Sequence, residues 1–226
     1  MNKNICYAAF VAVFAATALL FVSCGTTSKI GNEAYDNFRA DRPLSILVLP
    51  PLNNSVEVDA PGVIHSSTIF PLSEAGYYVV PIAVTQQMFR QNGIQTAADA
   101  HAVSPKRLRE IFGADAALYM TITKFGANFQ VIRSIVEVEV SVTLMDLRSG
   151  NELWKGKIIH QEEPSKTTVK GAGILGVLAG AVVDQVSNTL SNSSYSVGRN
   201  AMSILLNADD PKGVLYGPYN PKYESD

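Results

Sequence analysis

Cysteine and histidine are scarce in this sequence, which has two cysteines and three histidines among its 226 residues. Cys6 lies inside an apolar run near the amino terminus and Cys24 lies just after it. If that run is cleaved off, Cys24 is left as the only cysteine, and no internal disulfide can form. His65, His101 and His160 form no H-x-x-x-H pair, so a zinc site would need ligands from distant loops. We therefore expect a fold stabilised by its hydrophobic core, with no metal or other cofactor and with histidines that lie on the surface or form hydrogen bonds.

An excess of positive charge is also missing. The chain has 18 Lys and Arg residues against 20 Asp and Glu residues, and no basic stripe or block stands out. Nucleic acid is therefore not expected as a partner. Beyond the amino-terminal run, the most apolar stretch is GILGVLAGAVV at 173–183, which is too short to span a bilayer.

The amino-terminal apolar run covers residues 5–22, follows Lys3 and ends at Ser23-Cys24-Gly25. This layout is typical of a secretory signal peptide. A cysteine at the cleavage point resembles the bacterial lipobox, although Phe21 stands where leucine is usual, and Cys24 is the expected lipidation site. A true membrane helix and ordinary secretion with Cys24 as a free thiol are the alternatives.

The expected organisation follows from that cleavage. It divides the chain into a lipoprotein signal peptide (1–23), a polar tether (24–42), an α/β domain (43–208) and an extended carboxyl-terminal tail (209–226). Under the enterobacterial sorting rule, Gly25 after the cysteine favours the outer membrane. The missing acidic cluster favours a domain that faces the periplasm, with exposure at the cell surface as the alternative.

The domain alternates predicted strands and helices. Short apolar runs predict strands at 44–49, 77–80 and 116–123. Helices are predicted from Asp59 to Gly76, where Pro71 should bend or end the helix, from 85 to 91 with Val84, Met88 and Phe89 inward, and from Ser104-Pro105 to Gly113. The stretch between Gly93 and Val103 is expected to be a loop.

The strongest periodic signal comes after these elements. Apolar residues occupy every second position from 136 to 144, and Glu137 and Glu139 lie among the residues between them. This period of two predicts a long strand with one buried and one solvated face. Residues 152–160 return as its hairpin partner after a turn at 148–151. The fold class is therefore α/β, with a mixed sheet of about five strands and helices packed on it.

Two helices are predicted after the hairpin. On the one at 172–190, Gly173, Gly176 and Gly180 line one side and favour close contact with another helix, either within the fold or in a copy or partner. The second covers residues near 195–206. The G-x-G-x-x-G pattern at 171–176 follows a polar stretch instead of a strand, so we do not interpret it as a nucleotide site. Tyr216 and Tyr219 of the tail are added as candidate interface residues.

No catalytic set emerges from the remaining polar residues. His65 is followed by Ser66-Ser67, but neighbours on a helix do not face each other and no G-x-S-x-G elbow is present. Glu137 and Glu139 are expected to be a solvated strand face. Asn53-Asn54-Ser55 follows the first strand, where α/β sheets often bind ligands, although a turn explains it equally well.

Several stretches together resemble a family of bacterial lipoproteins of unknown function that includes a meningococcal vaccine-candidate antigen. They are LPPLNNSVEVDAP, LSEAGYYVVP, LREIFGADAALYMTIT, LMDLRSGNELW and GVLYGPYNPKY. The resemblance implies a fold similar to the amino-terminal domain of the Tol translocation protein. It also implies a trafficking or assembly role, with curli-secretion-type lipoproteins as candidate partners, and it carries over no catalytic residues.

Three functions stay open from the sequence. The favoured one is a non-enzymatic accessory in envelope transport, secretion or assembly, acting through contacts with envelope proteins or as a homo-oligomer. The alternative is a lipid-anchored hydrolase or ligand-binding protein whose site forms only in three dimensions. The third is a structural protein or surface antigen.

Overall fold

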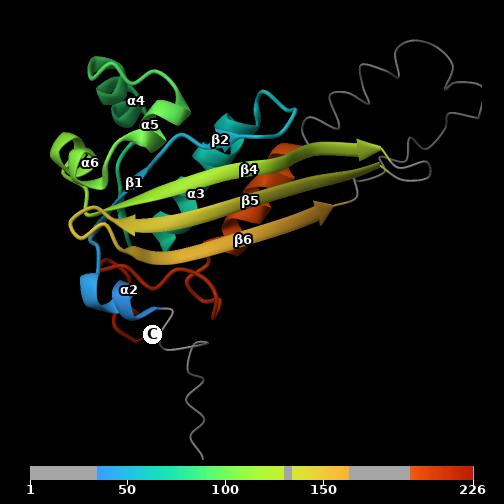
Figure 1. Ribbon diagram of the computed structural model, residues 1–226. Helices are drawn as coiled ribbons and strands as arrows, with labels where there is room; N and C mark the ends of the chain where they lie inside the picture. Colours follow the sequence, from blue (N-terminus) through green and yellow to red (C-terminus); the bar gives the residue numbers. More distant parts are fainter. Residues whose placement is uncertain (1–34, 130–133, 163–193, 226) are drawn as a thin grey trace, which may run out of the picture.

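The computed structural model describes residues 35–129, 134–162 and 194–225. These residues form one mixed sheet of six strands with helices on both faces (Figure 1). The strands are β1 (Ser45–Val48), β2 (Leu52–Asn53), β3 (Tyr78–Val79), β4 (Ala116–Phe129), β5 (Ser134–Asp146) and β6 (Glu152–Glu162). The labelled helices are α2 (Asp36–Asp41), α3 (Ala60–Glu74), α4 (Ile82–Gln91), α5 (Ala97–Ala102) and α6 (Pro105–Phe112). A further helix, at 194–205, agrees with the one predicted near 195–206.

The strand order is β3-β1-β4-β5-β6, with β2 paired to β4 beside β1. β1 runs parallel to β3 and β4, whereas β4, β5 and β6 form an antiparallel meander. This arrangement confirms the predicted α/β class with a mixed sheet. The prediction of about five strands left out β2, because two residues after Pro50-Pro51 carry no periodic signal.

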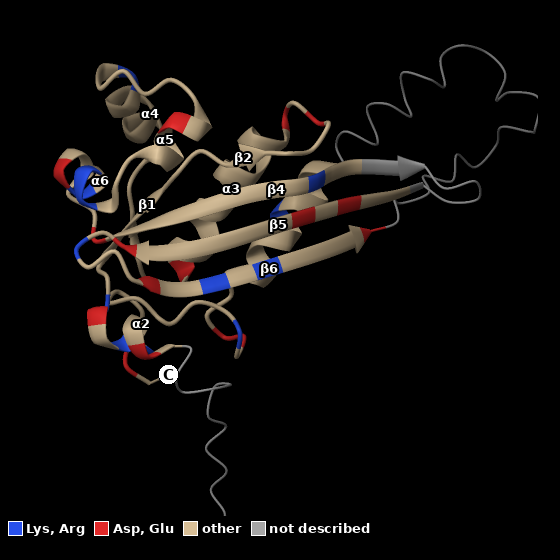
Figure 2. Ribbon diagram, viewed as in Figure 1, with Lys and Arg blue, Asp and Glu red and all other residues tan. Residues whose placement is uncertain are grey.

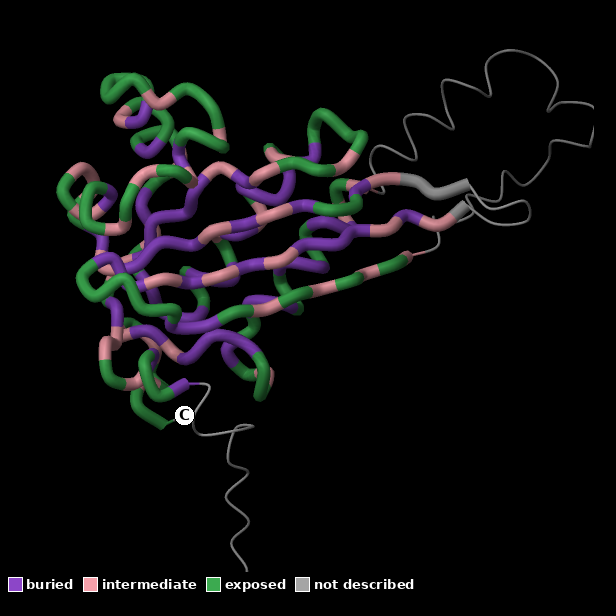
Figure 3. Tube along the Cα trace, in the orientation of Figure 1, coloured by how far each residue is buried: buried purple, intermediate pink, exposed green. Residues whose placement is uncertain are grey.

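The larger core lies on one face of the sheet, against α3 and the helix at 194–205. The alternation predicted on β5 is confirmed, since Val136, Val138, Val140 and Leu144 are all fully buried there. Figure 3 shows the purple buried segments running through the centre of the strands. Burial of such side chains stabilises the fold by about 1.5–3 kcal/mol each.

The second core is smaller and lies on the opposite face. It joins Leu47 of β1, and Leu49 just after that strand, to Phe89 of α4 and Leu108 of α6. Val84, expected to point inward from α4, is 44% exposed, and Thr85 is buried in its place. Helices α4, α5 and α6 gather at the end of the sheet near β1 (Figure 1). No described helix covers β5 and β6 on this face.

Two helical regions differ from expectation. Of the two effects predicted for Pro71, the ending of the helix does not occur, since α3 continues to Glu74 and is closed by a bond from the Ala75 N–H to the Pro71 carbonyl (2.9 Å). The predicted loop after Gly93 contains α5. Its signal was present in the sequence, because Thr96 and Asp99 form a capping box in which each side chain bonds the other's backbone N–H.

Both ends of the predicted domain extend further than expected. Part of the predicted tether is folded, since α2 buries Phe38 to 1% exposure in the larger core. The predicted extended tail is a series of turns, and its Val214 and Leu215 are buried in the same core. The apolar residues in these otherwise polar stretches are buried because they pack against the larger core of the sheet. None of the described helices is long and apolar enough to cross a membrane.

Candidate functional site

Two of the predicted site residues, Tyr216 and Tyr219, lie in the described structure. Cys24 and the glycines at 173, 176 and 180 lie outside the described residues, as does the whole predicted helix at 172–190. Tyr219 is 75% exposed, whereas Tyr216 is half-buried and its hydroxyl bonds Asp209. The interface predicted from these tyrosines stays a prediction.

The three histidines are all hydrogen-bonded, as expected. His65 Nε2 lies 3.1 Å from the Val48 carbonyl, and His101 Nε2 lies 3.0 Å from the Pro50 carbonyl. Burial lowers the pKa of both imidazoles, while the bonds to the carbonyls partly oppose it. His160 pairs with Glu162 at 2.9 Å. No group of three metal-ligating side chains occurs among the described residues.

The other polar candidates are also explained by local structure. Ser66 Oγ donates to the Gly62 carbonyl (2.8 Å), one turn back along α3. The Asn53 carboxamide oxygen accepts from the Ser55 N–H (3.0 Å) and hydroxyl (2.7 Å), which makes Asn53-Asn54-Ser55 a turn.

Glu137 and Glu139 are less solvated than we expected. Their side chains are 12% and 11% exposed, because Lys124 and Lys157 lie across them. Lys157 Nζ is 2.7 Å from Glu139 Oε1, and Lys124 Nζ lies 3.3–3.4 Å from both carboxylates. The hydrogen bond from Lys157 is the main cause that lowers the pKa of Glu139. Both acids are therefore members of a cross-strand charge network with the two lysines.

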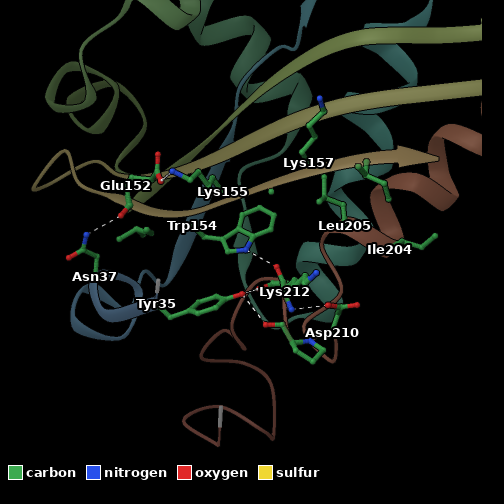
Figure 4. A pocket seen from close by; sticks show the side chains of 15 residues that line it. Tyr35, Asn37, Glu152, Trp154, Lys155, Lys157, Ile204, Leu205, Asp210 and Lys212 are labelled. Carbon is green, nitrogen blue, oxygen red and sulfur yellow. Dashed lines mark hydrogen bonds and ion pairs between the residues drawn. The ribbon is translucent and has the colours of Figure 1, made fainter. Parts of the chain in front are cut away.

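A groove with a volume of about 760 Å³ runs along β6 (Figure 4). One wall is β6 itself, from Glu152 to Ile158. The opposite wall consists of Ile204 and Leu205 at the end of the last helix and the turn at 210–213. Tyr35 and Asn37, at the start of α2, close one end (Figure 4).

The Trp154 indole is held in this groove by two contacts. Its Nε1 donates to the Lys212 carbonyl (3.0 Å), which ties β6 to the tail across 58 residues. The ring also lies over Gly156, where an added Cβ would sit 2.6 Å from the indole and 2.8 Å from Leu205. Gly156 therefore lets the aromatic ring lie flat along the strand and form the floor of the groove.

The tail is held in place from the other side by Tyr35. The Tyr35 hydroxyl donates to the Gly213 carbonyl (2.9 Å) and lies 3.3 Å from the Pro211 carbonyl. These bonds satisfy backbone acceptors that would otherwise face the groove. The wall made by residues 210–213 is therefore positioned by both β6 and α2.

β6 is an edge strand of the sheet. Among the described residues, β5 is the one strand that pairs with it, so the backbone groups on its outer side belong to no strand ladder; of these residues, Glu152 at the start of β6 has its carbonyl bonded by the Asn37 side chain (3.2 Å). The consecutive residues from Glu152 to Ile158 all line the groove, so β6 presents its backbone edge to it. An open edge of this kind can accept another strand.

Sequence reasoning missed this site although some of its signal was visible. The hairpin strand at 152–160 was predicted with no strand after it, which already implies an edge. Trp154 ends the family-like stretch LMDLRSGNELW, but nothing around it in the sequence indicates a groove. The residues that make the opposite wall, Leu205 and Lys212, come from distant parts of the chain and only the tertiary structure brings them to β6.

Comparisons with known proteins agree on one family. A family model described as "Putative lipoprotein GNA1162-like" matches residues 33–219. The "Putative lipoprotein NMB1124/NMB1162" of Neisseria meningitidis serogroup B is 42% identical over 201 residues, which cover 89% of this chain and 92% of that protein. The crystal structure of lipoprotein GNA1162 from Neisseria meningitidis has a TM-score of 0.52 and 46% identity, and covers 65% of this chain and 99% of that one.

Proposed function

The chain belongs to the GNA1162-like lipoprotein family, and from that premise we propose that it is an anchored envelope lipoprotein that binds other envelope proteins as a non-catalytic accessory. The process it serves would be transport, secretion or assembly in the envelope. The family accounts for the lipoprotein, and the proposal adds that this lipoprotein acts by binding other proteins.

The anchor in this proposal is a lipid on Cys24, placed in the outer membrane with the domain facing the periplasm. Each buried methylene of an acyl chain contributes about 0.8 kcal/mol, and two or more chains are needed for firm anchoring. Anchoring restricts the protein to the membrane surface, which raises its effective concentration toward partners on the same membrane. Weak contacts can then be sufficient for function.

The observation that supports the proposal is the groove at the free edge of β6. It combines an apolar lining, made by Trp154, Ile158 and Leu205, with a strand whose outer side pairs with no other described strand. Proteins commonly protect such edges with a covering element or leave them for a partner. Here the groove lies between β6 and the tail residues at 210–213 (Figure 4).

Site-specific photo-crosslinking in intact cells tests this proposal. A photoreactive amino acid would replace Lys155, which is 75% exposed at the groove, and a second variant would carry it at exposed Arg90 of α4. We expect defined adducts with envelope proteins from position 155 and none of the same adducts from position 90. Identical adduct patterns at both positions, or no adduct at 155, would contradict a binding role for the groove.

A further inference from the structure

We propose that the groove binds an extended segment of another envelope protein as a strand added to β6, and that this segment alternates apolar and acidic residues. The inference rests on the proposed function, because it names the chemistry of the partner for the same groove. Three features of the described structure carry it: the strand edge, the apolar side of the groove and the charge of the opposite side.

The edge sets the binding mode. β6 is eleven residues long, and on its outer side no described strand pairs with it, although the Asn37 side chain already bonds the Glu152 carbonyl at its start. Residues 152–158 line the groove, and at about 3.3 Å per residue they span roughly 20 Å, enough to pair with a segment of about six residues. Backbone hydrogen bonds would supply affinity and alternate side chains would supply specificity.

The apolar requirement comes from the side of β6 that faces the last helix. Trp154 and Ile158 point to this side, together with Leu205 and Ile204, which is 49% exposed. Every second residue of an added strand would face these side chains. Small or branched apolar residues would fill the hollow and remove its surface from water.

The acidic requirement comes from the other side of β6. Lys155 and Lys157 are 75% and 55% exposed on the open sheet face, and Glu139 of neighbouring β5 contacts Lys157 from one flank. Figure 2 shows these blue positions on β6 beside the red ones on β5. On the outer flank of β6 there is no strand among the described residues. Acidic residues of a strand added there would lie beside the lysines of β6, as Glu139 of β5 does on the inner flank.

The same lysines disfavour a second copy of β6 as the partner. Two β6 strands paired edge to edge would bring Lys155 and Lys157 of one copy close to those of the other, and like charges on neighbouring strands destabilise the pairing. Lysine on an edge strand is a common protection against self-association. An acidic strand is not repelled by it.

The test measures binding of synthetic capped peptides to the full-length lipidated protein in detergent. The first probe is a short peptide in which valine and glutamate alternate. One control has the same residues in two blocks, and another replaces glutamate by lysine. We expect the alternating acidic peptide to bind at least about tenfold more tightly than either control, which corresponds to about 1.4 kcal/mol.

Backbone methylation of the peptide distinguishes strand addition from other modes. N-methyl groups on alternate residues block one edge of an extended peptide, and moving them by one residue blocks the other edge. We expect one methylated series to lose binding and the other to keep it. Equal binding by both series would overturn strand addition.

Charge reversal at Lys155 tests the electrostatic part. Lys155→Glu should weaken binding of the acidic peptide by about tenfold and improve that of the lysine peptide, whereas Arg90→Glu on α4 should change neither. Thermal melts of both variants establish that they are folded. If Lys155→Glu is folded and leaves both affinities unchanged, the acidic requirement is wrong.

Two outcomes separate this inference from the proposed function. Crosslinks from position 155 without any peptide binding would refute the alternating strand and leave the groove as a binding site. Self-association that competes with the peptide would identify a second copy as the occupant and also overturn the inference. Absence of both crosslinks and peptide binding would refute both proposals.

Discussion

Gly76 and Gly217 lie backbone against backbone, so the carboxyl-terminal tail is docked on the turn that follows α3. A Cβ on Gly217 would sit 2.4 Å from the Gly76 carbonyl oxygen, and one on Gly76 would sit 2.4 Å from the Asn220 nitrogen. The Gly217 N–H donates to the Ala75 carbonyl (2.7 Å), and the Tyr219 N–H donates to the Gly76 carbonyl (3.0 Å). This contact positions the chain that leads back to the groove wall at 210–213.

Gly217→Ala should therefore destabilise the protein. The added methyl group has no space, so the tail must shift and lose its bonds to the turn, at a cost of about 1–3 kcal/mol. Gly62→Ala is the matched control, because nothing lies within 4 Å of a Cβ at that position of α3. Urea unfolding of both variants checks this, and an equal, small effect of the two substitutions would refute the tight contact.

Asp146→Asn should weaken the turn between β5 and β6. The Asp146 side chain is 0% exposed and accepts hydrogen bonds from the backbone N–H groups of Arg148 and Ser149, each at 2.7 Å, and from the Arg148 guanidinium at 2.9 Å. Burial raises its pKa, but these donors outweigh it and the pKa is lowered overall.

Loss of the charge in Asp146→Asn should lower the free energy of unfolding by about 2 kcal/mol, because hydrogen bonds to charged groups contribute about 1.5–3 kcal/mol to stability. Since the folded pKa is lowered, the ionised carboxylate stabilises the fold above the unfolded pKa of about 3.9, and the effect is lost as the pH falls through the folded value. Unfolding at pH 7 and in acid measures this. A difference between wild type and variant that does not shrink in acid would contradict it.

His65 should make the free energy of unfolding depend on pH below about 6.5, the ordinary pKa of its imidazole. Burial holds its pKa below the ordinary value of 6.5, so below about pH 6.5 the unfolded chain binds the proton first. The free energy of unfolding should then decrease as the pH falls. His65→Gln keeps a donor for the Val48 carbonyl but cannot titrate, so its unfolding should be less sensitive to pH. Equal pH slopes for wild type and variant would refute this role.

Cys24→Ala tests the anchor. The variant should lose its acyl chains, and fractionation should recover it outside the membrane pellet, whereas wild type stays in the pellet. A conservative replacement at the neighbouring position, Ser23→Ala, serves as the control and should not change fractionation. Membrane retention of the Cys24 variant would contradict lipid anchoring, and mass spectrometry of wild type should show the acylated cysteine.

Local patterns in the sequence determined much of the fold. The alternation at 136–144 predicted β5 and its buried face, and Ser104-Pro105 with Gly113 predicted the limits of α6. These signals are readable because strand alternation and helix caps depend on residues only a few positions apart. The same reasoning missed α5 because its Thr96–Asp99 capping box was not recognised.

The groove, by contrast, depended on tertiary structure. The sequence alone determined a hairpin and a tryptophan at 154, but it did not show that Leu205 and Lys212 would lie beside them. It also predicted Glu137 and Glu139 as solvated, since it could not show Lys124 and Lys157 lying across them. Contacts between residues far apart in the chain are decided by how the whole core packs, and no short-range pattern records them.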